Sequence, residues 1–154
     1  MARSDKHAGQ GRVALVTGAN RGMGLETCRQ LLARGLRVVL TAREEDAAER
    51  ALRTLAAPAA SALALRLDVT DAASIEAARR TIEEQLGPVD VLVNNAAVLL
   101  FEESDVLEIP ADGFSRTLET NLLGVIAACK AFVPPMSVRT QPGSTALAST
   151  PFLR

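Results

Sequence analysis

The clearest structural signal in the chain is the stretch VALVTGANRGMG, which runs from Val13 to Gly24. An apolar run of strand character passes directly into a turn that contains Gly18, Gly22 and Gly24, and a helical pattern follows. Glycines at these positions leave little side-chain bulk, so the backbone can approach a ligand closely, and the first N–H groups of the helix point toward it. The stretch therefore favours a turn that holds a pyrophosphate. The alternative interpretation is a turn at the start of a helix that binds no ligand and contains glycines only because larger side chains would not fit.

Short apolar runs alternate with amphipathic stretches along the chain. Strands are predicted over 12–17, 36–42, 62–69, 89–95 and 143–150, and helices from the glycine turn to Gly35, over 44–57, from Asp71 to Gly87 and over about 110–133. The side chains of the last helix that are expected to face inward are Phe114, Leu118, Leu122, Val125, Cys129 and Phe132. This order predicts an α/β fold, a Rossmann-like doubly wound parallel sheet of about five strands with helices on both faces. Ligands of such sheets bind at the carboxyl ends of the strands.

Composition and charge narrow the class of protein. The chain has 154 residues, 48% apolar and 23% charged, with a net charge of −1, which fits one globular domain and predicts neither nucleic acid nor a membrane as partner. Cys28 and Cys129 lack metal-ligand spacing and are typical of reduced cysteines in a cytoplasmic protein. We expect a disordered N-terminal arm over 1–11 and a dinucleotide-binding domain over 12–154.

The residues after the second strand bear on which dinucleotide is bound. A site for NAD usually has an acidic residue there, about 20 residues past the glycines, to bond the ribose 2′-hydroxyl. This chain has Thr41, Ala42 and Arg43 instead, with Arg21 inside the glycine turn. Two guanidinium groups suit the 2′-phosphate of NADP, which is therefore favoured over NAD. The alternative is that both arginines are solvated and that neighbouring glutamates partly neutralise Arg43.

Five motifs in order give the chain a family resemblance. They are TGANRGMG after the first strand, LTAR after the second, LDVTD after the third, NNAA after the fourth and ETN within the long helix. With these motifs the sequence resembles the short-chain dehydrogenase/reductase family, in its carbonyl-reductase-like, non-extended branch, over about residues 12–136. The resemblance implies reversible hydride transfer between a nicotinamide and a small-molecule carbonyl or alcohol.

The resemblance also implies roles for individual residues. Those expected to bind the cofactor are Gly18, Asn20, Arg21, Gly22, Met23, Gly24, Thr41, Arg43, Asp68, Val69, Asn95, Ala96 and Ala97. Among them, Asp68 and Val69 match the pair that contacts the adenine, and the segment from Asn94 to Ala97 matches the family's Asn-Asn-Ala-Gly beside the ribose, with Ala97 in place of the glycine. Asn121 matches the helix asparagine that bends the helix and holds a proton-relay water.

The sequence departs from the family pattern where the proton is transferred. Family members use a tyrosine, a lysine four positions later and a serine beyond the fifth strand. This sequence has no tyrosine, its lysines are Lys6 and Lys130, and Ser149 or Thr150 stands only roughly at the serine position. We therefore expect the cofactor-binding portion of such an enzyme, without its C-terminal strands, catalytically incompetent alone and able to form a homo-oligomer through the 110–133 helix. The alternative is a non-catalytic NADP-binding or scaffold module.

Overall fold

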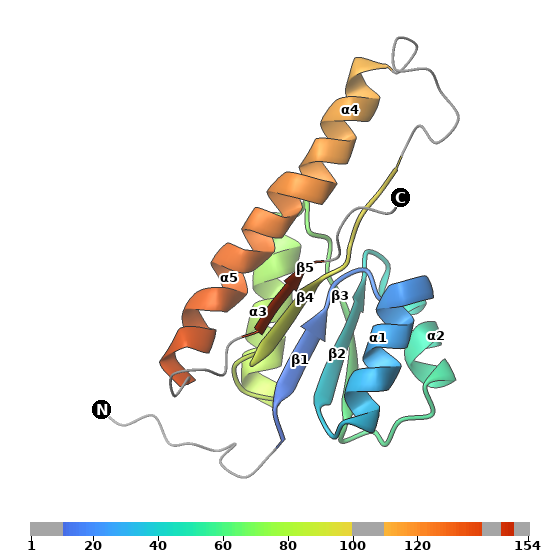
Figure 1. Ribbon diagram of the computed structural model, residues 1–154, viewed down its shortest axis with the longest axis vertical. Coiled ribbons are helices and arrows are strands. Elements are labelled where there is room, and N and C mark those ends of the chain that lie inside the picture. Colours follow the sequence, from blue (N-terminus) through green and yellow to red (C-terminus); the bar gives the residue numbers. More distant parts are fainter. Residues whose placement is uncertain (1–10, 100–109, 140–145, 150–154) are drawn as a thin grey trace.

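A computed structural model describes residues 11–99, 110–139 and 146–149 of the chain (Figure 1). The expected disordered arm over 1–11 lies almost wholly outside these residues. In chain order the elements are β1 (Val13–Val16), α1 (Gly22–Ala33), β2 (Arg37–Ala42), α2 (Glu45–Thr54), β3 (Ala62–Arg66), α3 (Ala72–Gln85), β4 (Val91–Asn94), α4 (Ala111–Leu118), the π-helical turn η1 (Glu119–Leu123), α5 (Gly124–Arg139) and β5 (Ala146–Ser149). The strands form one parallel sheet in the order β3-β2-β1-β4-β5, which confirms the predicted doubly wound fold.

The helices cover both faces of the sheet, with α1 and α2 on one side and α3 and α5 on the other (Figure 1). Successive residues of β1 supply both cores, because side chains alternate along a strand. Val13 and Leu15 pack with side chains of α3 and α5, whereas Ala14 and Val16 pack with side chains of α1 and α2. The continuous apolar sequence of β1 is explained by this burial on both faces.

The end of α1 follows the prediction. Gly35 adopts φ +80°, a left-handed conformation that suits glycine, and its N–H donates to the carbonyl oxygen of Leu32 at 2.9 Å. The next N–H, that of Leu36, donates to the carbonyl oxygen of Leu31 at 3.1 Å. These paired bonds close the helix and turn the chain into β2.

The second helix is shorter than expected. The sequence predicts it over 44–57, but α2 ends at Thr54, and Ala56 adopts a left-handed φ of +48°. Pro58 disfavours helical backbone at the residue before it, so the chain leaves the helix ahead of the proline. The apolar and alanine-rich pattern carries no signal of this turn.

Asp71 begins α3 as predicted. Its Oδ1 accepts hydrogen bonds from the backbone N–H groups of Ala73 at 3.0 Å and Ser74 at 3.2 Å. Ile75 and Ile82 of this helix are buried in the core cluster that also contains residues of α5. The helix therefore begins where the sequence predicted, and its buried isoleucines orient it against the sheet.

The prediction for the long helix is wrong in two respects. The helix does not end near Val133 but continues through Pro134 and Pro135 to the end of α5, where Met136 is only 1% exposed. Its inward face is also different, because the residues of the expected stripe that are in fact exposed are Phe114, Leu118 and Leu122. Phe132 is buried as expected. The buried face of α5 runs through this residue together with Gly124, Ala128 and Met136.

The physical reason is the position of the helix relative to the sheet. Of the two α-helical segments of the long helix, only α5 lies over the strands, whereas α4 extends beyond their carboxyl ends (Figure 1). The π-helical turn η1 inserts an extra residue between the two segments and shifts the register of the stripe. Within the described residues no helix combines the length and the apolar character needed to cross a bilayer.

Candidate functional site

A cleft of about 330 Å³ lies at the carboxyl edge of the sheet, between the glycine turn and the ends of β2, β3 and β4. The residues that line it are Gly18, Asn20, Arg21, Gly22, Met23, Gly24, Arg43, Leu67, Asp68, Val69, Thr70, Asn95, Ala96, Ala97, Val98 and Thr120. The fold thus brings together every residue expected to bind the cofactor except Thr41. It does so because parallel strands end at one edge and each motif directly follows a strand.

Thr17 joins the glycine turn to the segment after β4. Its hydroxyl oxygen accepts hydrogen bonds from the backbone N–H groups of Asn95 and Ala96, both at 3.0 Å. In the opposite direction, Nδ2 of the Asn95 side chain donates hydrogen bonds to the carbonyl oxygens of Thr17 at 3.0 Å and Gly18 at 2.9 Å. The amide nitrogen of Asn95 therefore fixes the turn.

Glycine is required at positions 18 and 24 because neighbouring atoms lie too close for a side chain. A Cβ on Gly18 would lie 2.7 Å from the Cα of Ala96, and Gly18 also has a left-handed φ of +61°. A Cβ on Gly24 would overlap the Asn95 side chain and lie 2.8 Å from the Cα of Ala19. Both glycines let the turn pack directly on the segment after β4, so any side chain here would displace the floor of the cleft.

The start of α1 is open to an anion. Gly22 has a left-handed φ of +58° but open space around it, so its backbone conformation is what requires glycine. No side chain caps α1, and its first turn contains no acidic residue. The first N–H groups of the helix and its positive dipole end are therefore available to a phosphate.

Two exposed arginines flank this helix start. Arg21 precedes α1 and Arg43 follows β2, and both line the cleft. In the described part of the chain neither guanidinium group makes a salt bridge or hydrogen bond, and Arg43 forms no salt bridge with Glu44 or Glu45. Both guanidinium groups therefore stand at the rim of the cleft without an ion-pair partner among the described residues, where an anion can contact them.

Thr41 does not belong to the cleft. Its side chain is fully buried, and its hydroxyl donates to the carbonyl oxygen of Val16 at 3.1 Å. Its own carbonyl oxygen accepts from Ala19 in the glycine turn at 2.7 Å. Thr41 therefore supports the turn from inside the sheet and has no surface to offer a ligand.

Asp68 and Val69 form the wall that follows β3. Oδ1 of Asp68 accepts from the backbone N–H of Thr70 at 2.9 Å and from its hydroxyl at 2.8 Å. Val69 is 6% exposed and faces both the cleft and the core. The Asp68 N–H donates to the Ser74 hydroxyl oxygen at 3.0 Å, which ties this wall to α3.

Asn121 lies in η1 and binds backbone rather than lining the cleft. Its Oδ1 accepts from the Val98 N–H and its Nδ2 donates to the Val98 carbonyl oxygen, both at 2.8 Å. The helix bend expected from the family resemblance coincides with this π-helical turn. Asn94 is buried at the end of β4 and donates from Nδ2 to the sulfur of Cys129 at 3.5 Å, on the α5 side of the sheet.

The residues proposed near the reacting centre are described only in part. Ser149 ends β5 opposite Asn94, and nothing is described of its side chain. Thr150 lies outside the described residues. The ranges that are described hold no cluster of histidine, cysteine, aspartate or glutamate suited to a metal ion.

Sequence reasoning missed four residues that line the cleft. Leu67 and Thr70 flank the Asp68-Val69 pair, Val98 follows NNAA, and Thr120 precedes Asn121. Leu67 and Thr70 belong to the LDVTD motif, Thr120 belongs to ETN, and Val98 directly follows NNAA, so membership in or proximity to a motif was the available signal.

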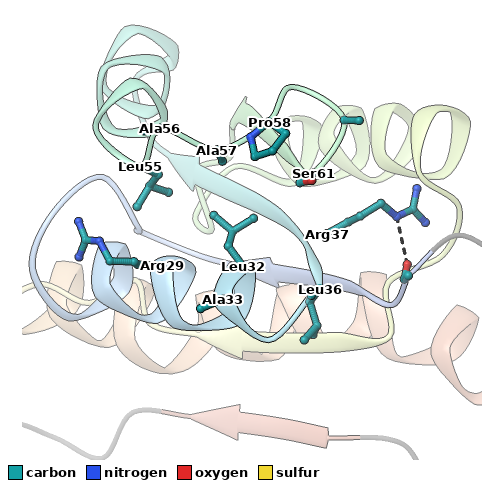
Figure 2. Close-up of a pocket in the computed structure, with 13 residues that line it drawn as sticks. Arg29, Leu32, Ala33, Leu36, Arg37, Leu55, Ala56, Ala57, Pro58 and Ser61 are labelled. Atoms are coloured by element: carbon teal, nitrogen blue, oxygen red, sulfur yellow. Dashed lines mark hydrogen bonds between the residues drawn. The ribbon is translucent and has the colours of Figure 1, made fainter.

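A larger hollow of about 790 Å³ lies at the opposite end of the strands (Figure 2). Of the described residues that line it, only Arg29 and Arg37 carry ionisable side chains. Arg37 donates to the carbonyl oxygens of Gly11 at 3.0 Å and Leu86 at 2.9 Å, and Arg29 pairs with Glu26. With both cations engaged and the other lining side chains apolar or small apart from one serine, this hollow has no arrangement for chemistry.

Comparison with known proteins agrees with the fold and the cleft. The family profile described as short chain dehydrogenase matches residues 12–148. The chain is 36% identical over 151 residues to (+)-neomenthol dehydrogenase of Arabidopsis thaliana, covering 85% of this chain and 51% of that protein. It is 38% identical over 127 residues to the 3-oxoacyl-acyl-carrier-protein reductase FabG of Salmonella typhimurium, covering 82% and 50%. It spans about half the length of these curated relatives.

A solved structure shows the same architecture. An actinorhodin polyketide ketoreductase variant with NADPH superposes with a TM-score of 0.79 and 34% identity, covering 90% of this chain and 52% of that one. The sheet and its edge cleft define a Rossmann-type fold. Together with the family match, they show that this chain belongs to the short-chain dehydrogenase/reductase family of oxidoreductases.

Proposed function

We propose that this chain binds NADP in the cleft at the carboxyl edge of the sheet, in preference to NAD. The observation that carries the proposal is the pair of arginines, Arg21 and Arg43, at a rim where the NAD-binding carboxylate would stand. A guanidinium presents a planar fork of donors that matches a phosphate group. The ketoreductase with NADPH among the structural neighbours supports the same cofactor.

The residues of the cleft fit the parts of this cofactor. The glycine turn and the open start of α1 would hold the pyrophosphate, since a Cβ at Gly18 would fill the space against Ala96. Asp68 and Val69 would hold the adenine, and Ala96 and Ala97 would lie beside the ribose. When bound, the cofactor supplies a hydride donor or acceptor at its nicotinamide.

The proposed reaction is that of the family, reversible hydride transfer with a small-molecule carbonyl or alcohol. These 154 residues contain no tyrosine, so they lack the group that the family resemblance assigns to proton transfer. Both polar atoms of the Asn121 side chain bind the Val98 backbone, and a neutral amide is not a general acid, so Asn121 does not replace the tyrosine. The chain therefore acts as the cofactor-binding portion of the enzyme, residues 12–154, and is inactive without a proton donor.

A homo-oligomer through the long helix is also proposed. The helix leaves Leu118, Leu122, Leu123 and Ile126 exposed by 43% to 56% on one continuous stretch. Apolar side chains gathered on one element are typical of a protein–protein contact. A second copy of the chain is the occupant that the family resemblance favours.

Titration with NADPH and NADH tests the cofactor proposal. The dissociation constants are measured from the change in nicotinamide fluorescence on binding. The constant for NADPH is expected to be at least about tenfold lower than that for NADH, because one charge-assisted phosphate contact contributes about 1.5–3 kcal/mol. Equal affinity, or tighter binding of NADH, would contradict the proposal. The scaffold alternative also requires NADPH binding, so a chain that binds neither dinucleotide would contradict both interpretations.

A further inference from the structure

Gly124 begins α5 and sits directly against Val69 of the cleft wall. A Cβ placed on Gly124 would lie 2.6 Å from Cγ2 of Val69 and 2.9 Å from its Cβ. Carbon atoms in proteins pack at about 3.5–4.0 Å, so not even a methyl group fits here without movement. The missing side chain of Gly124 therefore sets how closely the helix approaches the wall.

Val69 has little freedom to move away from the helix. The residue before it, Asp68, is tied to Ser74 of α3, and the Asp68 carbonyl oxygen accepts from the Asp71 N–H at 3.1 Å. Val69 is itself 6% exposed and packed in the core between the sheet, α3 and α5. Displacement away from α5 therefore carries Val69 toward the cleft that it lines.

The helix has equally little freedom to retreat. One turn before Gly124, Asn121 makes its two 2.8 Å hydrogen bonds with the backbone of Val98. Four residues after Gly124, Ala128 is fully buried in the same core as Val69. The helix is thus anchored on both sides of Gly124, and Thr120 of the same segment lines the cleft.

We infer that Gly124 is a positioning residue for the adenine end of the cleft: it sets the location of Val69 and so the space left for the purine of a 2′-phosphorylated adenine nucleotide. This inference rests on the proposed NADP site. Gly124 itself touches no ligand and acts through Val69. An added methyl group pushes Val69 into the purine space while Arg21 and Arg43 stay in place.

The test uses adenosine 2′,5′-bisphosphate, which carries the adenine and the 2′-phosphate but no nicotinamide. Calorimetric titration of Gly124→Ala is expected to show affinity about tenfold weaker than that of the unmodified chain, since overpacking at such a site is costly. Val69→Gly in the same chain removes both Cγ2 and Cβ, the two atoms that the new methyl group would meet, so the double variant should bind within about threefold of Val69→Gly alone. Lys130→Ala, an exposed change on the same helix, should leave the affinity unchanged.

The outcomes separate this inference from the proposed function. Failure of the unmodified chain to bind the bisphosphate overturns the NADP proposal and this inference together, whereas equal binding by Gly124→Ala overturns this inference alone. A defect of folding lowers the fraction of binding sites and leaves their dissociation constant unchanged, and that result would also overturn it. If Gly124→Ala does not fold, the double variant with Val69→Gly decides. Its failure to recover binding to the level of Val69→Gly alone contradicts the inference.

Discussion

Thr17 and Asn95 are hydrogen-bonded in both directions across the floor of the cleft. The Thr17 hydroxyl oxygen accepts from the Asn95 N–H, and Asn95 Nδ2 donates to the Thr17 carbonyl oxygen, each at 3.0 Å. The pair connects β1 to β4 at the point where both strands end. It holds the glycine turn and the NNAA segment as one unit, although 78 positions separate the two residues.

Replacing Thr17 by valine is expected to destabilise the fold. Thr17 is 1% exposed, and loss of its hydroxyl leaves the N–H groups of Asn95 and Ala96 without their acceptor. Each buried donor left without a partner costs about 1–3 kcal/mol, so urea denaturation should show a loss of at least about 1 kcal/mol. Thr17→Ser keeps the oxygen and serves as the control. A valine variant as stable as the serine variant would contradict this account.

Replacing Arg43 by alanine is expected to remove most of the preference for NADPH. The guanidinium group is exposed and lines the cleft, so its loss costs a phosphate contact without disturbing the core. Affinity for NADPH should fall about tenfold or more, and affinity for NADH should change little. Arg80→Ala, an exposed arginine on α3 away from the cleft, is the matched control. Equal losses of affinity for NADPH and NADH would show that Arg43 does not contact the 2′-phosphate.

Asp71 is expected to make the stability of the fold depend on pH. The hydrogen bond from the Ser74 backbone N–H, with help from Arg66, lowers the pKa of the Asp71 carboxyl below its ordinary 3.8. Because the folded-state pKa is the lower one, this stabilisation is complete above about pH 4 and is lost as the pH falls through the folded pKa. Asp71→Asn keeps a capping oxygen without the charge, so its melting temperature should approach that of the unmodified chain as the pH falls through the folded pKa of Asp71. A constant difference between the two proteins at every pH would contradict this role.

Replacing Leu122 by glutamate is expected to weaken self-association. Leu122 is 52% exposed on η1, so a charge there costs little in the isolated fold but is unfavourable in an apolar contact between two copies. Light scattering should show a concentration-dependent mass for the unmodified chain and the monomer mass for the variant. Arg80→Ala, an exposed change on α3 outside the helix of the proposed contact, should associate like the unmodified chain. A monomeric unmodified chain at all concentrations would contradict the proposed homo-oligomer.

Local patterns in the sequence were sufficient for most of the fold. The buried strand and glycine turn at Val13 to Gly24, the left-handed Gly35 after α1 and the capping Asp71 before α3 all depend on near neighbours in the chain. Their order then implied parallel strands, and parallel strands imply a shared carboxyl edge. The residues grouped in the cleft could therefore be anticipated from the motifs that follow each strand.

The tertiary structure alone decided what depends on contacts between distant segments. Thr41 and Phe114 show this most clearly, because Thr41 was expected in the cleft and is buried beneath it, whereas Phe114 was expected in the core and is exposed. Hydropathy records what a side chain prefers, but not how far a helix extends past a sheet or where a π-helical turn shifts its register. The contact of Gly124 with Val69 has no local signature for the same reason, because a glycine's missing side chain acquires meaning only from the neighbour that occupies its space.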